Sequence, residues 1–228
     1  LLQNLENLLI FGSYPRVVLA GSTEERIANL RELAGDSLYK DVLKFQSLKS
    51  SEMVQKLLVA LSLQIGGEVS YREVGNLIEI SKQTAHIYTE ILERAFVVFK
   101  ALPFSRNLRK EIGKTRKVYF LDNGIRNSLI GNLNQIPLRS DAGALWENFV
   151  VSEMKKKQYD TVNSHALHFW RTYDQQEIDL IEDYDGTLHA TEIKWQKLKK
   201  QPPKAWRENY PGARFRAISK DNFLEHLL

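Results

Sequence analysis

The sequence predicts an α+β protein with three parts: a helical beginning, a helix-turn-helix with a β-hairpin, and a mixed region of helices and strands. Apolar residues recur at helical spacing through much of the first half of the chain. Residues 69–99 read as helix, tight turn, helix and strand. Residues 141–228 then combine helices with antiparallel hairpins. These patterns place the domain boundaries at 1–48, 49–135 and 136–228.

The composition is that of an ordinary globular chain, with 228 residues, 43% of them hydrophobic, and a formal net charge of +4. The absence of cysteine excludes disulfides and thiolate metal sites, and it fits a cytoplasmic location. No apolar run approaches the ~20 residues that span a bilayer, so we expect no membrane partner. The chain begins at Leu1 inside an amphipathic pattern, and we interpret it as a fragment of a longer protein.

The first 48 residues are predicted to be helical, with breaks at "FGSYP" and "AGSTEE". Ser22 or Thr23 can cap the helix after the second break, with Glu24 and Glu25 in its positive first turn. Such short helices cannot bury their apolar faces alone, so we expect them to pack on another part of the protein.

A clearer helix covers residues 50–65 and ends at Gly66-Gly67. Residues 69–122 then follow the order of a winged helix-turn-helix, with Ser81 as the cap of the second helix. A strand at 96–102 would pair with a strand at 116–122 to form the wing. The predicted inward residues of the three helices are Val54, Leu57, Leu58, Leu61 and Ile65, then Tyr71, Val74, Leu77 and Ile78, then Ala85, Tyr88, Ile91 and Leu92.

The exposed start of the second helix in this motif can contact nucleic acid, because its side chains bond base edges or phosphates. Residues 100–117 form a basic wing that would neutralise phosphates beside it, so DNA is the partner we expect. The alternative is a protein-binding role, since winged helices also mediate protein contacts and Glu90 and Glu93 would repel DNA further along the helix. The residues predicted at the helix start are Lys82, Gln83, Thr84 and His86.

One short motif is misleading. The tetrapeptide "IGKT" at 112–115 resembles the end of a phosphate-binding loop. Leu108 stands where the full pattern requires glycine, and no strand leads from there into a helix. The sequence therefore does not predict nucleotide hydrolysis in this chain.

The strongest candidate for a site lies in the hairpin formed by "EIDLIED" and "LHATEIKW". If Asp185-Gly186 is a two-residue type I′ turn, Asp179 lies directly opposite Glu192. A four-residue loop would instead make the two acids diagonal neighbours on the same face. Facing carboxylates repel each other, so a positive group is expected between them, and Lys194 points to the same face.

Two interpretations of this hairpin follow. Paired carboxylates suit a hard divalent cation such as Mg²⁺, which would polarise a phosphate and lower the pKa of a bound water, with Lys194 stabilising negative charge. The alternative is an ordinary salt bridge, in which Lys194 pairs with Glu177 and Asp179 is a solvated surface acid. Spacing alone favours the salt bridge, because acid pairs are common on strands.

A wider set of residues resembles the PD-(D/E)XK, restriction-endonuclease-like superfamily: the helical acid Glu147 in "LWENFV", Asp179 in "EIDLI", and "EIK" at 192–194. Strings such as "FGSYPRVVL", "SYREVGNLIEISKQTAHIYTEILE" and "FWRTYDQQEIDLIE" resemble the C-terminal half of a group of prokaryotic AAA+ ATPases. That resemblance implies the end of an ATPase helical lid at 1–48, a winged helix at 49–135 and a nuclease-like domain with a mixed sheet at 136–228. ATP would bind only in an N-terminal domain absent from this chain.

The resemblance also implies the roles of the site residues. Glu147, Asp179, Glu192 and Lys194 would be catalytic, with the three acids holding or organising Mg²⁺ or Mn²⁺. Gln176 and Glu177 would flank the site. Beyond the start of the second helix, Arg106, Arg109 and Lys110 of the basic wing are predicted to contact DNA, and the basic run with Lys197, Lys199 and Lys200 offers further phosphate contacts.

Three functions follow from these observations. The first is a Mg²⁺-dependent phosphodiesterase that acts on DNA. The second is a non-catalytic nucleic-acid or protein-binding module coupled to the upstream ATPase, and the third is a regulator that contacts only proteins. A homo-oligomer is compatible with each of them.

Overall fold

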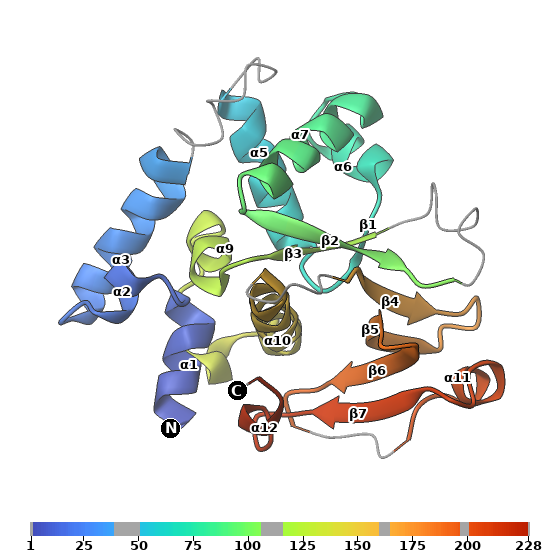
Figure 1. Ribbon diagram of the computed structural model, residues 1–228. Coiled ribbons are helices and arrows are strands. Elements are labelled where there is room, and N and C mark those ends of the chain that lie inside the picture. The colour runs from blue at the N-terminus through green and yellow to red at the C-terminus, as the bar shows by residue number, and fades with distance from the viewer. Residues whose placement is uncertain (1, 39–50, 106–115, 160–164, 197–200, 228) are drawn as a thin grey trace.

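The computed structural model describes residues 2–38, 51–105, 116–159, 165–196 and 201–227 (Figure 1). The predicted α+β class is confirmed, and the strands form one mixed sheet. The helices are α1 (Leu2–Phe11), α2 (Pro15–Val18), α3 (Thr23–Glu32), the π-helical turn η1 (Leu33–Ser37), α5 (Ser51–Leu63), α6 (Tyr71–Leu77), α7 (Lys82–Arg94), α9 (Asn123–Leu129), the 3₁₀ turn η2 (Ile136–Leu138), α10 (Ala142–Tyr159), α11 (Lys204–Asn209) and α12 (Leu224–Leu227). The strands are β1 (Glu68–Val69), β2 (Val98–Pro103), β3 (Arg116–Phe120), β4 (Leu167–Arg171), β5 (Glu177–Tyr184), β6 (Thr187–Ile193) and β7 (Arg214–Ile218).

The described strands join into a seven-stranded sheet in the order β1-β3-β2-β4-β5-β6-β7. The pairs β1–β3, β2–β3, β4–β5 and β5–β6 are antiparallel, whereas β2–β4 and β6–β7 are parallel. The β2–β4 pair joins the predicted winged-helix region to the predicted nuclease-like region, through Leu102 beside His168 and Pro103 beside Phe169. The two regions therefore share one sheet.

The two helices predicted within residues 69–99 are present as α6 and α7. Ser81 caps α7 by accepting a hydrogen bond from the Thr84 amide at 3.0 Å. The predicted inward residues of α5 and α7 are buried, as are Tyr71, Val74 and Ile78 of α6 and the turn after it. The prediction for Leu77 is wrong: its side chain is 64% exposed, because it lies at the rim of a groove between α5 and α6.

The N-terminal helices pack on this chain itself. Ser22 caps α3 as predicted, accepting from the Glu25 amide at 3.1 Å. Leu5, Leu9 and Leu30 are buried in the main core. Asn127 of α9 donates hydrogen bonds to the carbonyl oxygens of Leu9 and Ile10, at 3.0 and 2.9 Å, and so fixes the end of α1.

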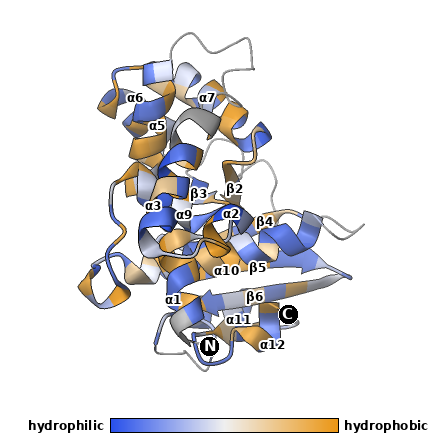
Figure 2. Ribbon diagram, turned by 90° about the vertical axis from the view of Figure 1, so that its left-hand side faces the viewer, coloured by the Kyte–Doolittle hydropathy of each residue, from blue (hydrophilic) through white to orange (hydrophobic). Residues whose placement is uncertain are grey.

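Helix α10 lies at the centre of the molecule and positions the site (Figure 1). It contacts β3 and β6 on one side and α1, α9 and α12 on others. Figure 2 shows orange, hydrophobic ribbon in the middle of the molecule, near the label of α10. The apolar α10 residues Leu145, Phe149, Val150 and Met154 are all buried. Among the described residues no helix has the length and hydropathy that a membrane crossing requires.

Candidate functional site

The β5–β6 hairpin has the predicted two-residue turn. Asp185 and Gly186 both adopt positive φ angles, 52° and 67°, as a type I′ turn requires. Strand pairing runs from Tyr184 beside Thr187 to Leu180 beside Thr191. Asp179 and Glu192 are the next residues in that register, so the two carboxylates converge at the end of the ladder.

Lys194 supplies the positive group that was expected between these acids. Its Nζ lies 2.9 Å from Asp179 Oδ2 and 3.2 Å from Glu192 Oε1. The Ile193 amide also donates to Asp179 Oδ2 at 2.7 Å, which fixes that carboxylate against β6. Asp179 and Glu192 are 4% and 1% exposed, whereas the Lys194 side chain is 40% exposed. One half-exposed ammonium therefore covers two buried carboxylates.

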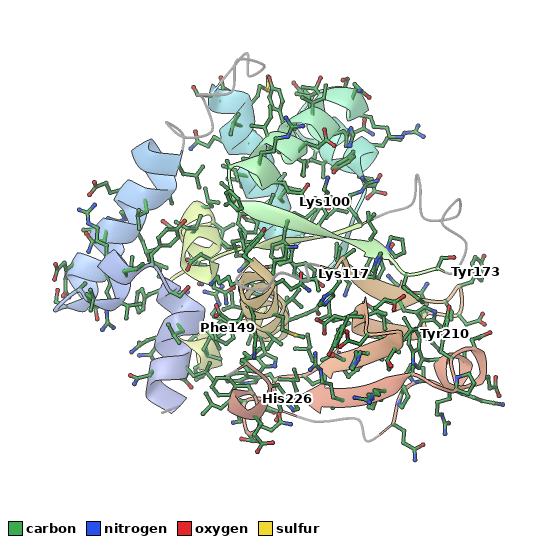
Figure 3. All side chains as sticks on the ribbon, viewed as in Figure 1. Lys100, Lys117, Phe149, Tyr173, Tyr210 and His226 are labelled. Atoms are coloured by element: carbon green, nitrogen blue, oxygen red, sulfur yellow. The ribbon has the colours of Figure 1, made fainter. Side chains whose placement is uncertain are left out.

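A second lysine lies beside this group and was missed at the sequence level. Lys117 of β3 is 2% exposed, and its Nζ lies 2.9 Å from Glu147 Oε1 and 2.6 Å from Glu177 Oε1. Tyr119, two residues along the strand, donates to the same Glu147 oxygen at 2.8 Å. Figure 3 shows Lys117 in the interior, near α10 and the start of the β4–β5 pair.

Helix α10 is tied to β3 next to these contacts. Asn148 accepts from the Phe120 amide at 2.8 Å and donates to the Phe120 carbonyl at 2.9 Å. This two-point bond fixes Glu147, the preceding residue, at the height of Lys117 and Tyr119. The position of Glu147 thus depends on the buried side-chain amide of Asn148, whose oxygen and nitrogen are bonded to the N–H and C=O of Phe120.

The electrostatics of the two lysines follow from these contacts. Burial by itself would lower the pKa of Lys117, but the carboxylates of Glu147, Glu177 and Asp179 raise it overall. The same holds for Lys194, where burial is outweighed by Asp179 and Glu192 and the pKa is raised. Both side chains are therefore cations at neutral pH.

Burial shifts the pKa of Glu147 and of Tyr119, which both lie beside Lys117. Burial raises the pKa of Glu147 above its usual value in spite of the lowering effect of Lys117, and the charge of Asp179 raises it further. Burial, followed by the Glu147 charge, raises the pKa of Tyr119 well above 10.0, so its hydroxyl stays a hydrogen-bond donor.

The salt-bridge interpretation of the hairpin is corrected in two respects. It paired Lys194 with Glu177, but Glu177 pairs with Lys117 instead. It also made Asp179 a solvated surface acid, but Asp179 is buried. Lys117 had been counted among the cations of the basic wing. The signal that could have found it is a lysine in an apolar strand, "KVYF", which indicates burial on both faces of a sheet.

Two further cations of the predicted wing make contacts within the protein. Arg116 lies over the ring of Tyr71, with its guanidinium carbon 4.1 Å from the ring centroid. Lys100 Nζ lies 2.8 Å from Glu93 Oε2. The predicted contacts at Arg106, Arg109, Lys110, Lys197, Lys199 and Lys200 lie outside the described residues.

The start of α7 is arranged as follows. Lys82 and Gln83 are exposed. The Thr84 hydroxyl lies 2.8 Å from the Ser81 hydroxyl, within the helix cap. His86 lies against Tyr71, with ring centroids 5.0 Å apart, and its Nε2 is 3.4 Å from Glu90 Oε1. Lys82 and Gln83 are therefore the side chains of this group that face solvent most openly.

The donor set can be tested against a divalent cation. Within the described ranges, no group of three or more His, Asp or Glu side chains is arranged to hold a metal ion. Mg²⁺, however, commonly uses one or two carboxylates and completes its shell with waters and substrate phosphate. Asp179 and Glu192 provide such a pair of oxygen ligands. The chemistry of this pair fits a hard cation, which would have to displace Lys194 from the two carboxylates. One oxygen of Glu147 is occupied by the buried Lys117 and Tyr119.

The fold and site define a class: an α+β protein in which an acid–lysine cluster lies where two segments of the chain share a sheet. Residues 2–135 match the family described as "Domain of unknown function (DUF8612)". This match covers more than half of the chain, so the protein belongs to that family. Residues 142–218 match "Domain of unknown function (DUF4143)", a domain often found in proteins associated with AAA ATPases. Lys117 lies in the first segment and the four acids lie in the second.

Several uncharacterized microbial proteins are similar to this chain. One from Mycobacterium tuberculosis is 25% identical over 191 residues, covering 83% of this chain and 42% of the relative. One from Methanocaldococcus jannaschii is 24% identical over 164 residues, covering 70% and 35%. One from Haemophilus influenzae is 23% identical over 176 residues, covering 75% and 41%. The chain thus spans less than half the length of these curated relatives. No solved structure gives a significant match.

Proposed function

We propose that the protein is a DNA-associated module in which Asp179, Glu192 and Lys194 form a site for divalent-cation-dependent cleavage of phosphodiester bonds. The observation that carries this proposal is the half-exposed Lys194 ammonium bonded to two buried carboxylates at the end of the β5–β6 ladder. In an ordinary surface salt bridge the carboxylates are solvated, but here the two carboxylates are buried and the lysine side chain is half-exposed. Such a lysine can exchange its partners for a phosphate and leave the acids to a cation.

Each residue has a role in this proposal. Asp179 and Glu192 would hold the cation, which when bound polarises the phosphate and lowers the pKa of a water ligand. Lys194 would donate hydrogen bonds to the phosphate oxygens that become more negative in the transition state. The Ile193 amide holds Asp179 in place, and Lys117 with Tyr119 holds Glu147 beside the site.

The partners of the module follow from the surface and the comparisons. Lys82 and Gln83 at the start of α7 would contact DNA, in the manner of a winged helix-turn-helix. The nuclease-like domain would then bring its acids to the backbone. The relatives are longer than this chain, and the second domain occurs with AAA ATPases, which supports an ATPase domain upstream in the same protein. ATP would be bound there.

Nicking of supercoiled plasmid DNA in Mn²⁺ or Mg²⁺ tests the catalytic proposal. Wild-type protein should nick the plasmid, and chelation of the cation should stop it. Asp179→Asn and Lys194→Met should lower the rate by about 10²-fold or more, the loss typical of an electrostatic group at the reacting centre. Asp183→Asn is the matched control, since Asp183 lies on the same strand but is exposed. Equal nicking by Asp179→Asn and Asp183→Asn would contradict the proposal.

A second candidate is a DNA-binding module without cleavage, favoured by the burial of Lys117 among the acids. That arrangement already neutralises part of the charge that a catalytic cation would face. In this case wild-type protein binds DNA in a salt-sensitive manner but does not nick any substrate. Lys82→Gln should weaken binding, measured by fluorescence anisotropy, whereas Asp179→Asn should not. Undetectable binding at low salt would leave a protein-binding role.

A further inference from the structure

Lys117 has no direct role in the proposed cleavage, yet its ammonium is buried among acidic side chains. Its ammonium lies among three acidic side chains: it contacts Glu147 and Glu177 directly and senses the charge of Asp179. The Phe169 ring lies on another side, with its centroid 5.6 Å from Nζ. The group is 2% exposed, so bulk water contributes little to its solvation. The oxygen atoms around Nζ therefore take the place of its water shell, as they would for a metal ion.

The charges in the cluster also point to this role. Glu147, Glu177, Asp179 and Glu192 are four carboxylates, and among the described residues Lys117 and Lys194 contact them through their ammonium groups. Without Lys117 the cluster would lose one positive charge, and the buried carboxylate of Glu147 would keep the Tyr119 hydroxyl as a donor but lose the cation beside it. A buried carboxylate that has lost its cation strongly favours an added cation or a proton.

We propose that Lys117 is a resident cation: its ammonium fills a cation position between the carboxylates of Glu147 and Glu177, and so leaves the cluster one position for a divalent cation, at Asp179 and Glu192. This inference rests on the proposed function in one respect: the single bound cation is the one that Asp179 and Glu192 would hold. Lys117 comes from β3, in the segment that matches the first family, and the acids come from the second segment. The number of cations is therefore set by a residue outside the domain that carries the acids.

Direct binding of Mn²⁺ to the chain, measured by electron paramagnetic resonance and calorimetry, tests this proposal without any need for cleavage. Wild type should take up one Mn²⁺ per chain, and Lys117→Met should take up one more. Lys117→Arg keeps the charge and should match wild type. Lys100→Met is the matched control, because Lys100 lies on the neighbouring strand β2 and pairs with Glu93, away from the cluster.

The outcomes separate this inference from the proposed function. If wild type and Lys117→Met take up the same amount of Mn²⁺ with the same affinity, the inference is overturned and the proposed site stands. If wild type takes up none and Lys117→Met takes up one, the resident-cation role is supported and the proposed cleavage site loses its cation. If neither binds Mn²⁺, both are overturned. Adding Glu192→Gln to Lys117→Met should remove one of its two Mn²⁺ ions and keep the other.

Folding of the variant is a second readout. Lys117→Met should unfold at a lower temperature than wild type in a metal-free buffer, and Mn²⁺ should raise its unfolding temperature more than that of wild type. A variant that folds only with Mn²⁺ supports the role directly. A variant that stays unfolded, or whose unfolding temperature does not respond to Mn²⁺, contradicts it.

Discussion

The two lysines of the acid cluster are held in opposite ways. Lys117 is enclosed, with a side chain 2% exposed, and its carboxylate partners come from a helix and a strand distant in sequence. Lys194 is 40% exposed, and its partners lie on its own hairpin. An enclosed ammonium cannot leave without opening the core, whereas a half-exposed ammonium can exchange partners at the surface. The same pairing of charges therefore serves a fixed role in one case and an exchangeable role in the other.

Lys117→Met gives the largest effect expected from this difference. Removal of one partner from a buried ion pair leaves an uncompensated charge, so the free energy of unfolding should fall by about 3–5 kcal/mol. Urea denaturation in a metal-free buffer measures it. Arg171→Met is the matched control: Arg171 also joins the two segments, through Glu68 at 2.7 Å, but the pair is partly exposed and should contribute about 1 kcal/mol or less. Equal losses of unfolding free energy in Lys117→Met and Arg171→Met would contradict the expected difference between an enclosed and a partly exposed ion pair.

Lys194→Met should have a smaller effect on stability, about 1–2 kcal/mol, because its acids lose one donor but Asp179 keeps the Ile193 amide. The same urea titrations measure this loss. Added Mg²⁺ should recover much of it, since the cation can replace the ammonium at the two carboxylates. A loss as large as that of Lys117→Met would show that Lys194 is as fixed as Lys117.

Glu147→Gln should change how stability depends on pH. Burial raises the pKa of Glu147 above the usual 4.5, so the folded protein holds this proton more tightly than the unfolded chain. Wild type should therefore lose stability relative to Glu147→Gln as the pH rises from 4.5 through the raised value. The change should be about 1 kcal/mol over one pH unit in that window. Denaturation curves of the two proteins that stay parallel with pH would contradict this account.

Local rules predicted the hairpin of the site well. The Asp185-Gly186 turn fixes the register, and the register brings Asp179 to Glu192 whatever the rest of the chain does. The buried faces of α5 and α7 followed from apolar residues at helical spacing, and Glu147, which the resemblance implied to be helical, lies on α10. These predictions depend on short distances along the chain, where turn geometry and helical spacing decide the outcome.

The partners of Lys117 could not be predicted by such rules. Lys117 is 30 residues from Glu147 in the chain, and its partners depend on how β2 pairs with β4. In the sequence this lysine follows a basic stretch, so the prediction assigned it to the same basic wing. The parallel β2–β4 pair is itself a long-range contact that no local pattern encodes. For the same reason the sequence did not indicate that the two segments share a sheet.

The shared sheet also restricts how the two segments can be separated or exchanged. A cut between α9 and α10 would expose the β2 edge on one fragment and the β4 edge on the other, and unpaired strand edges seek new partners. Each fragment would also keep half of an ion pair, Lys117 on one and Glu147 on the other. The fragments should then reassemble when mixed and aggregate when kept apart. A recombination event that replaced one segment would have to supply both a matching strand edge and a matching charge, so the two segments are expected to be inherited together.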